Sequence, residues 1–447
     1  MRKKNRILLI IICILSVCVM AGLIAFAFDI QTRMDLKNKQ AQTENQTDNM
    51  TARDDSIPAG YEAGNDSDDS NATGDGNITG NGNETKQEAP AKGTADGTDA
   101  EGSGTKENDN ASVTPIPEEE QPAAGSLVLA FAGDVNLDDN STPVKKYDSE
   151  KKDISKCLSE DLLKEMRDAD IMMLNNEFAF STRGEKTPNK SYTFRANPAR
   201  VEILKEMGVD IVSLANNHAL DYGRDALLDT FSTLDEAGID YVGAGKDLER
   251  AKAPIYYTIN GKRIAYVAAS RVIFAGSWYA TEDRPGMVGT YDPALICEVI
   301  RQAKAESDYV IVYVHWGVER TNYPEKYQRS LAQAYIDAGA DAVIGCHPHV
   351  MQGFEFYKGK LIAYSLSNFW FSRATVESAL LKLQIDSDGS IRPQLIPVMA
   401  KNNYTYLITD NKERDKYFNF IKKISFDIEI DDEGILSPKE GDSSAAE

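Results

Sequence analysis

The spacing of hydrophobic residues changes at about residue 126. From Ser126 onward, short apolar runs that suit β-strands alternate with amphipathic stretches that suit helices. We predict strands at residues 127–132, 171–174, 211–214, 240–242, 255–259, 263–268, 309–314 and 342–344. We predict helices at residues 154–167, 199–207, 224–237, 293–305 and 326–338. Alternation of this kind favours an α/β fold, a sheet covered by helices.

Turn residues indicate antiparallel strands at two places. Asn260-Gly261 separates the strands 255–259 and 263–268, which predicts a hairpin. Later apolar runs, with Lys358-Gly359 and Asp388-Gly389 between or after them, predict antiparallel additions at residues 354–357, 361–366 and 379–385. We expect the globular domain to span residues 126–400. A C-terminal extension, residues 401–447, is expected to hold a helix at 412–423 and a polar tail.

The N-terminal residues carry a membrane signal. Residues 1–6 contain four basic side chains, and residues 7–28 then run for 22 positions without a charge. Because about 20 apolar residues cross a bilayer, we predict a transmembrane signal-anchor at 7–28. Residues 1–6 would be cytoplasmic and the domain extracytoplasmic, as in a single-pass protein of a Gram-positive cell membrane. Ala25-Phe26-Ala27 resembles a cleavage site, so a removed signal peptide is the alternative.

Most of the charge lies after this segment. The chain of 447 residues has a formal net charge of −21. Residues 41–125 hold 19 acidic and 4 basic side chains and one aromatic residue, Tyr61. Such a composition buries too little apolar surface to fold, which predicts a disordered acidic linker at residues 29–125. The overall acidity argues against nucleic acid as a partner, because phosphate contacts need clustered cations.

All four histidines of the chain lie just after a predicted strand. His218 lies after the strand 211–214, His315 after 309–314, and His347 and His349 after 342–344. The carboxyl ends of strands in an open α/β sheet are where ligands usually bind. Other polar residues near strand ends are Asp134, Asn136, Asn175, Asn176, Glu177, Asn216 and Asn217.

These side chains combine carboxylate, amide and imidazole groups. Such a mixture suits Mn, Fe or Zn better than Ca or Mg. Two metal ions that share a bridging carboxylate could activate a water and bind a phosphoryl or carbonyl oxygen. Pro348 is expected to keep the backbone extended, so that His347 and His349 project toward different metals. The residues alone therefore predict a metal-dependent, hydrolase-like site.

Six short motifs follow one another along the domain: GDVNL, NNEF, NNHALDYG, VHWGVE, GADAVIGCHPHVMQ and YSLSNF. Together they resemble the CapA/PgsA family of bacterial capsule and poly-γ-glutamate synthesis proteins. The resemblance runs from about residue 127 to about residue 371. The family's domain in turn resembles calcineurin-like metallophosphoesterases, which implies a four-layer αββα sandwich with a metal site at the loops between two sheets.

The resemblance also implies roles for individual residues. The implied metal ligands are Asp134, Glu177, Asn217, His315, His347 and His349. Glu177 takes the bridging position, Asp134 and His349 belong to the first metal, and the other three belong to the second. His218 would be the general acid or a transition-state donor. The phosphoesterase motif Asp-x-His is Asp134-x-Asn136 here, and because an amide is the weaker ligand, the first metal site is expected to be the weaker one.

Five other side chains are candidates for contact with a substrate. They are Asn136, Arg195, Trp316, Glu319 and Asn368. A guanidinium such as Arg195 could bind a phosphate or a carboxylate, and a surface ion pair is its alternative. Asp221 is expected to cap the helix that starts near residue 224. Cys346 is expected to be a packed thiol rather than a nucleophile.

Three functions remain open at this point. The leading hypothesis is a membrane-anchored protein outside the cell that takes part in the synthesis, export or attachment of an anionic surface polymer such as poly-γ-glutamate. Its partners would be the polymer and a membrane polymer-synthesis complex. The second hypothesis is a general cell-surface phosphoesterase with a phosphorylated substrate. The third is a non-catalytic module that binds the polymer without cleaving it.

Overall fold

The computed structural model describes residues 125–439. The predicted basic segment, the membrane anchor, all but the last residue of the linker, and the end of the polar tail lie outside these residues. No helix between residues 125 and 439 has the length and apolarity that crossing a bilayer requires.

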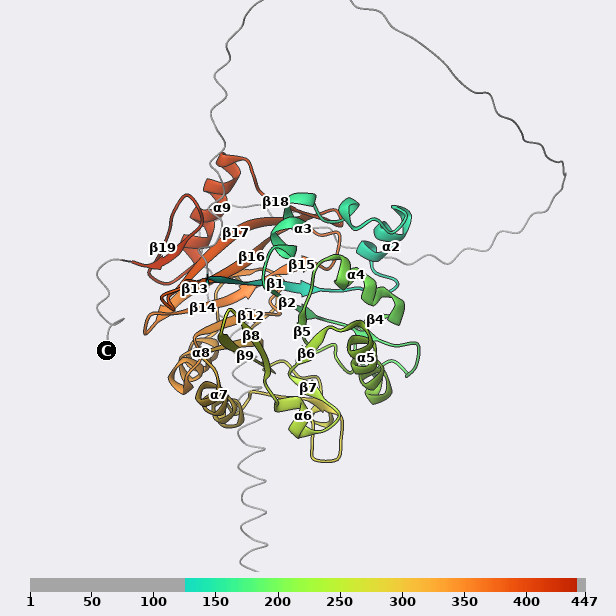
Figure 1. The fold of residues 1–447 in the computed structure, drawn as a ribbon. Coiled ribbons are helices and arrows are strands. Elements are labelled where there is room, and N and C mark those ends of the chain that lie inside the picture. The colour runs from blue at the N-terminus through green and yellow to red at the C-terminus, as the bar shows by residue number, and fades with distance from the viewer. Residues whose placement is uncertain (1–124, 440–447) are drawn as a thin grey trace, which may run out of the picture. The chain divides into compact units, whose positions relative to one another are not determined.

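Two β-sheets form the centre of the described domain (Figure 1). The larger sheet has eight strands in the order β18-β17-β16-β1-β2-β5-β6, and β15 pairs with β1. Its strands are β1 (Leu127–Val135), β2 (Ile171–Asn176), β5 (Ile211–Ser213), β6 (Asp240–Val242), β15 (Asn368–Trp370), β16 (Val376–Ile385), β17 (Ile391–Lys401) and β18 (Tyr404–Leu407). β1, β2, β5 and β6 are parallel, whereas β16, β17 and β18 are antiparallel additions.

The smaller sheet has six strands in the order β13-β14-β12-β11-β9-β8. They are β8 (Ile255–Ile259), β9 (Lys262–Ser270), β11 (Tyr309–His315), β12 (Ala342–Cys346), β13 (Met351–Tyr357) and β14 (Lys360–Leu366). The four central strands are parallel, and β8 and β13 close the two edges in antiparallel pairs. Two-stranded pairings join β3 (Ala179–Phe180) to β4 (Arg195–Ala196), β7 (Ala244–Gly245) to β10 (Gly286–Met287), and β19 (Ile428–Ile430) to β20 (Leu436–Pro438).

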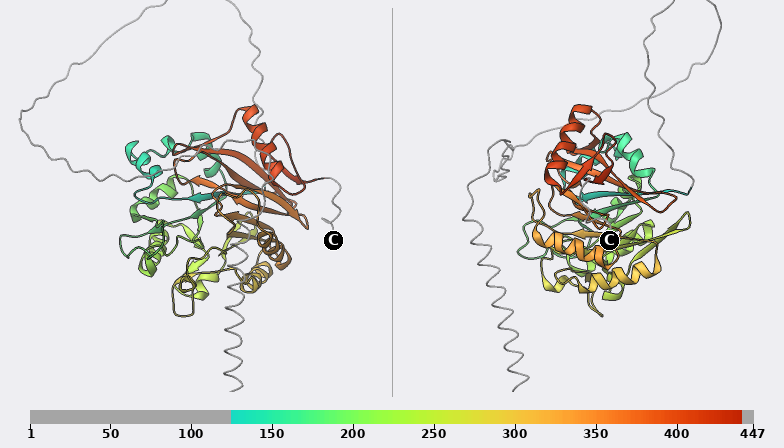
Figure 2. Two further views of the ribbon diagram at one scale, coloured as in Figure 1. Left: turned by 180° about the vertical axis from the view of Figure 1, so that it is seen from behind. Right: turned by 90° about the vertical axis from the view of Figure 1, so that its left-hand side faces the viewer.

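Helices cover the outer face of each sheet (Figures 1 and 2). Those on the larger sheet are α2 (Thr142–Ser149), α3 (Glu160–Arg167), α4 (Val201–Glu206) and α5 (Gly223–Ala237). Those on the smaller sheet are α7 (Ala294–Glu306) and α8 (Lys326–Ala338). The remaining helices are α6 (Leu248–Lys252) and α9 (Asn411–Ile424), with short 3₁₀ turns η1 (Ile154–Lys156), η2 (Pro198–Arg200) and η3 (Gly276–Trp278). The predicted α/β class is confirmed, with its layers in the order helix, sheet, sheet, helix.

Alternating side chains of β1 enter two different cores. Leu127, Leu129 and Phe131 lie in the core between the two sheets, whereas Ala130 and Ala132 lie in the core beneath the helices. Successive side chains of a strand point to opposite faces of its sheet. β1 is therefore buried on both faces, which explains why it reads as a continuous apolar run.

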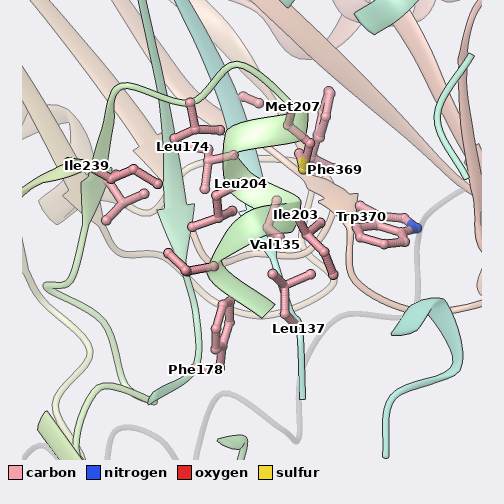
Figure 3. Packing of buried hydrophobic residues seen from close by; sticks show 14 of the residues in the cluster. Val135, Leu137, Leu174, Phe178, Ile203, Leu204, Met207, Ile239, Phe369 and Trp370 are labelled. Atoms are coloured by element: carbon pink, nitrogen blue, oxygen red, sulfur yellow. The ribbon is translucent and has the colours of Figure 1, made fainter. Parts of the chain in front are cut away.

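The helix α4 packs over the ends of two strands (Figure 3). Ile203 and Leu204 of α4 join Val135 of β1 and Leu174 of β2 in one buried cluster. Burying an aliphatic side chain of this size contributes about 1.5–3 kcal/mol. This packing holds the carboxyl ends of β1 and β2, where the polar site residues begin.

All three predicted turns are confirmed, and Asp388-Gly389 lies between the antiparallel strands β16 and β17. Asn260-Gly261 joins β8 to β9, and Lys358-Gly359 joins β13 to β14. The φ angles of these four residues are 51°, 77°, 50° and 71°. Positive φ at both central residues is the geometry of the type I′ turn, which matches the twist of the flanking strands.

The prediction of one continuous helix at residues 154–167 is wrong. The structure has η1 at its start, and α3 begins only at Glu160. Between them, the carbonyl of Cys157 accepts from the N–H of Thr405 at 2.9 Å, and the N–H of Ser159 donates to the carbonyl of Thr405 at 2.9 Å. These backbone bonds to β18 replace the helical ones.

The larger sheet continues past residue 400. β17 ends at Lys401, and Asn402-Asn403 turn the chain back into β18 with φ angles of 55° and 62°. α9 then places Tyr417 and Ile421 in the core between the sheets. The boundary expected between residues 400 and 401 therefore falls inside a hairpin of the domain.

Candidate metal centre

The carboxyl ends of parallel strands from both sheets meet in one cluster. Glu177 directly follows β2 of the larger sheet, and His315 ends β11 of the smaller one. Nε2 of His315 is 3.8 Å from Oε1 of Glu177. Both side chains are fully buried. The site is therefore shared between the two sheets.

Two carboxylates of this cluster, those of Asp134 and Glu177, are completely buried. Nδ2 of Asn175 donates to both, at 2.8 Å from Oδ1 of Asp134 and 3.2 Å from Oε2 of Glu177. Asn175 is held in turn by Asn216, whose Nδ2 donates to its Oδ1 at 3.0 Å. A chain of two amides thus positions both carboxylates. The sequence analysis places both asparagines near strand ends and assigns neither of them a role.

The two histidines of the His-Pro-His step have left-handed backbone conformations. Because φ is 101° at His347 and 59° at His349, the predicted extended backbone is wrong. Such conformations are costly for residues with a Cβ and persist where surrounding contacts hold them. The N–H of His347 donates to Oδ2 of Asp134 at 3.1 Å, and Nδ1 of His349 lies 3.4 Å from the same oxygen. Asp134 therefore holds the turn that presents both imidazoles.

Potential ligand atoms fall into overlapping sets. Among residues 125–439, four sets of three side chains have such atoms within 4.8 Å of one another. One set is Glu177, His315 and His347. Another is Asp134, Glu177 and His349. The side chains assigned from sequence to each of two metals thus lie together, and Glu177 belongs to both sets.

Two buried atoms of the cluster lack hydrogen-bond partners among the described residues. They are Oε1 of Glu177 and Nδ1 of His347. An unsatisfied buried polar atom costs about 1–3 kcal/mol, and uncompensated buried charge costs more. A divalent cation would satisfy such atoms and offset the charge of the two carboxylates. The residues present therefore fit a divalent metal ion.

The pKa shifts follow from burial and from neighbouring charges. Burial raises the pKa of Glu177 well above its usual range, and the charge of Asp134 raises it further. Burial also acts to raise the pKa of Asp134, but hydrogen bonding and charge from His349 outweigh it and leave that pKa below its usual range. Burial lowers the pKa of His315 well below its usual value and lowers the pKa of His347 to about 3. Both imidazoles are therefore neutral at pH 7, which is the form that binds metals.

The imidazole of His218 is oriented by a buried carboxylate. Nδ1 of His218 is 2.6 Å from Oδ2 of Asp221. Nζ of Lys190 also lies 2.9 Å from this nitrogen. Because the contact with the carboxylate, which only accepts, is the shorter one, we assign the Nδ1 proton to His218. Nε2 is then turned toward the cluster, 3.8 Å from Oε1 of Glu177. Burial lowers the pKa of His218, and Asp221 opposes that shift.

The prediction that Asp221 caps a helix is wrong. α5 begins at Gly223, with no side chain bonded at its N-cap. Asp221 instead accepts the N–H of Phe194 at 2.7 Å and forms an ion pair with Lys190. Nζ of Lys190 also donates to the carbonyl of Asn217 at 2.6 Å. Lys190 lies in a polar loop without a recognisable motif, so the sequence offers no signal for its role.

The two predicted amide contributions differ in their contacts. Oδ1 of Asn217 lies 2.8 Å from Nε2 of His315 and so faces the cluster. Oδ1 of Asn136 accepts the N–H of Asp138 at 2.8 Å and so serves a local turn. Asn136 therefore already uses its oxygen at the position where the phosphoesterase motif has a histidine.

Two of the predicted substrate contacts have other partners. The guanidinium of Arg195 donates to carbonyls of the 183–184 turn at 2.8 and 3.2 Å and lies over the ring of Tyr222. Trp316 is fully buried, and its Nε1 donates to the carbonyl of Tyr364 at 2.8 Å. Arg195 thus supports a loop, and Trp316 belongs to the core beneath α7 and α8.

Glu319 and Asn368 lie beside the histidines. The exposed Glu319 forms a further set with His347 and His349. Oδ1 of Asn368 is 2.8 Å from Nδ1 of His349. An oxygen bonded to one ring nitrogen orients the imidazole and leaves the other nitrogen for a ligand. Cys346 is fully buried and burial raises its thiol pKa well above the usual range, so it is packed as predicted.

Comparisons with known proteins agree with the resemblance in the sequence. Residues 128–373 match the model of a family described as bacterial capsule synthesis protein PGA_cap. Similar proteins include the capsule biosynthesis protein CapA of Bacillus anthracis, 34% identical over 242 residues, and the PGA biosynthesis protein CapA of Bacillus subtilis, 38% identical over 217 residues. These matches cover 53% and 48% of this chain and 58% and 57% of the relatives. The chain thus spans a little over half the length of the curated relatives it matches.

Similar solved structures are more distant. A hypothetical protein from Thermus thermophilus has 17% identity and a TM-score of 0.37, covering 61% of this chain and 99% of that protein. The NAD nucleotidase of Haemophilus influenzae has 12% identity and a TM-score of 0.36, covering 67% of this chain and 57% of that protein. The family assignment is carried by the sequence match.

Proposed function

Because the chain belongs to the bacterial capsule synthesis protein PGA_cap family, we propose that it acts in the synthesis, export or attachment of an anionic surface polymer such as poly-γ-glutamate. Similar proteins bear the names capsule biosynthesis protein and PGA biosynthesis protein. The substrate and the membrane synthesis complex are our inference, since the chain spans only part of those relatives.

We also propose that residues 7–28 hold the protein at the outer face of the cell membrane. The support is the uncharged run of 22 residues after four basic side chains. An acidic linker at 29–125 repels itself and would let the domain reach away from the bilayer. Protease added to intact cells should remove the domain, and full protection of the domain would contradict this location.

The observation that carries the proposal is the buried cluster with two unpartnered ligand atoms. Two divalent ions, Mn, Fe or Zn, would be held by Asp134, Glu177, Asn217, His315, His347 and His349. When bound, such ions supply an activated water and polarise a carbonyl or phosphoryl oxygen. The site at Asp134 would be the weaker one, because Asn136 stands where an imidazole would add a ligand.

The chain's own residues support a hydrolase-like role. Asp221 holds Nδ1 of His218, so Nε2 has a fixed direction toward the cluster. In its protonated form, Nε2 can donate a proton to a leaving group. An oriented imidazole of this kind favours a catalytic site over one that only binds the polymer.

Metal content and hydrolysis test this function in the full-length chain. We expect bound divalent metal by inductively coupled plasma analysis, and cleavage of labelled oligo-γ-glutamates. The double variant His347→Ala with His349→Ala should lose the metal. His218→Ala is the matched control, which should keep the metal and lose cleavage.

Each alternative has its own result. Unchanged metal content in the double variant would contradict the metal centre. Turnover of an aryl phosphate without cleavage of the oligomer would favour a general phosphoesterase. Full metal occupancy and affinity for the polymer, without any hydrolysis, would favour a binding module.

A further inference from the structure

Arg271 stands beside the candidate metal centre without belonging to it. It directly follows β9, whose last residue, Ser270, is opposite His315 in the sheet. The backbone N–H of Arg271 donates to the carbonyl of His315 at 2.7 Å. Arg271 is therefore anchored one strand away from a candidate metal ligand.

The guanidinium of Arg271 has aromatic neighbours and no acceptor. Its Cζ is 3.5 Å from the ring centre of Tyr291 and 4.9 Å from that of Tyr327. No hydrogen bond or ion pair joins it to any residue between 125 and 439. The side chain is partly exposed. It therefore combines a full positive charge with hydrogen-bonding capacity that is free for a ligand.

The two tyrosines hold this cation in place. The hydroxyl of Tyr327 accepts the N–H of Gly317 at 2.9 Å, which ties its ring to the loop that follows His315. A guanidinium stacked on aromatic rings keeps its N–H edge available for a planar acceptor. Because the side chain is already ordered, a ligand that binds it loses less conformational entropy.

Several other arginines of the described domain are already engaged. Arg183 pairs with Asp229, Arg200 with Asp139 and Asp148, Arg301 with Glu298, and Arg329 with Glu355. Arg195, the arginine favoured from sequence, bonds to backbone carbonyls. Arg271 is thus a guanidinium beside the cluster whose N–H edge a substrate can use.

Exposed apolar side chains occur in the loops that follow strands of both sheets. In the described domain they are Tyr192, Phe274, Tyr291, Val318 and Tyr323. All five lie in segments that lead from the carboxyl end of β2, β9 or β11 to the next major helix. Tyr291 is the ring over which the guanidinium of Arg271 lies. Arg271 therefore offers a cation flanked by rings next to the cluster.

We propose that Arg271 is a carboxylate-binding subsite for the polymer chain, which rests on the proposed function. Each residue of a γ-linked glutamate chain carries a free carboxylate and a short run of methylene groups. When one amide bond of the polymer lies at the cluster, the carboxylate of a neighbouring glutamate pairs with the guanidinium of Arg271 through two hydrogen bonds. The methylene groups lie against the exposed rings. In this way Arg271 favours an anionic chain, although the net charge of the whole protein is negative.

Binding of a fluorescently labelled oligo-γ-glutamate to the full-length chain tests the subsite. We expect Arg271→Gln to raise Kd about 10-fold, which corresponds to about 1.4 kcal/mol, because the variant loses a charge-assisted pair with the carboxylate. Arg271→Lys keeps the charge but cannot form two parallel hydrogen bonds, so its Kd should lie between those of the wild type and Arg271→Gln. Arg301→Gln, on an exposed helix face, is the matched control and should change Kd less than about twofold. An oligo-γ-glutamine of equal length should bind weakly and without dependence on Arg271.

The outcomes separate the subsite from the function. Equal affinity of the wild type and Arg271→Gln overturns the subsite and leaves the proposed function standing. No affinity of the wild type for the oligomer overturns both. If Arg271→Gln melts at a lower temperature than the wild type, the affinity of Arg271→Lys for the oligomer is used instead. An affinity equal to that of the wild type overturns the bidentate pairing. Metal content should be unchanged in all three variants.

Discussion

The two sheets build their halves of the cluster in different ways. The larger sheet supplies carboxylates that an amide chain of Asn175 and Asn216 holds in place. The smaller sheet supplies the imidazole of His315 at a strand end and those of His347 and His349 on a backbone with positive φ. Nδ1 of His347 has no partner among the described residues. The His347 turn is held by Asp134, which belongs to the larger sheet.

Because of this difference, the histidines of the smaller sheet depend on residues of the larger sheet. Asn368, which bonds to His349, also lies in the larger sheet, on β15. Damage to the larger sheet's half should therefore disturb both halves, whereas damage to the histidines should stay local. The following predictions test that asymmetry.

The largest effect is expected for Asp221→Asn, which disrupts the orientation of His218. Removal of oriented general acid catalysis lowers rates by about 10²–10⁴-fold. We expect kcat for oligomer cleavage to fall by at least about 100-fold with metal content unchanged. The measurement is steady-state kinetics with metal analysis of the same sample. Loss of metal in this variant would mean that Asp221 supports the ligands and not the imidazole alone.

Asn216→Ala should damage both halves at once. It removes buried hydrogen bonds to Oδ1 of Asn175, to the carbonyl of Asn176 and from the N–H of His218. At roughly 1 kcal/mol each, we expect the free energy of unfolding to fall by about 2–4 kcal/mol. Metal affinity should fall as well, measured by titration after chelation. The exposed Asn140→Ala is the control, and normal metal affinity in Asn216→Ala would refute the dependence of one half on the other.

Glu177→Gln should stabilise the chelated protein while it weakens metal binding. Burial and Asp134 raise the pKa of Glu177, so its carboxylate form destabilises the metal-free fold. That penalty is absent below the ordinary Glu pKa and grows as the pH rises toward the folded pKa. We expect the variant to be more stable than chelated wild type at pH 7, measured by calorimetry, with a smaller gain at pH 4. A variant less stable at pH 7 would show that another cation already compensates Glu177.

The smallest effect is expected for Trp316→Phe, within the smaller sheet's core. The change leaves the carbonyl of Tyr364 without its 2.8 Å donor. We expect a loss of about 1–2 kcal/mol in the free energy of unfolding. Metal content and the Kd for the oligomer should not change. A large rise in that Kd would show that Trp316 contacts the substrate, as the sequence analysis predicted.

Local patterns in the sequence predicted much of the fold. The residue range of α8 was predicted as observed, and Asn260-Gly261 and Lys358-Gly359 form turns where expected. β18 was missed, although Asn402-Asn403 is a turn signal of the same kind. The break before α3 could not be predicted, because Thr405 lies far along the chain from the residues it bonds to.

The histidines were found from their places after strands, and the structure brings all four into one cluster. The roles of Asp221, Arg195 and Lys190 were not found in this way. Each depends on a partner in another loop, as Asp221 depends on Phe194 and Lys190.

The sequence by itself determined the strands, most helices, the tight turns and the polar residues at the strand ends, because periodicity and turn chemistry act within a few residues. Only the tertiary structure decided which polar groups are satisfied and which are left for a ligand. Asp134 holds the N–H of His347 across 213 positions of the chain. Within residues 125–439, the guanidinium of Arg271 has no hydrogen-bond acceptor and that of Arg195 has two, for the same reason. The partners of a buried or half-buried polar group come from whichever distant segments the packing of two sheets brings beside it.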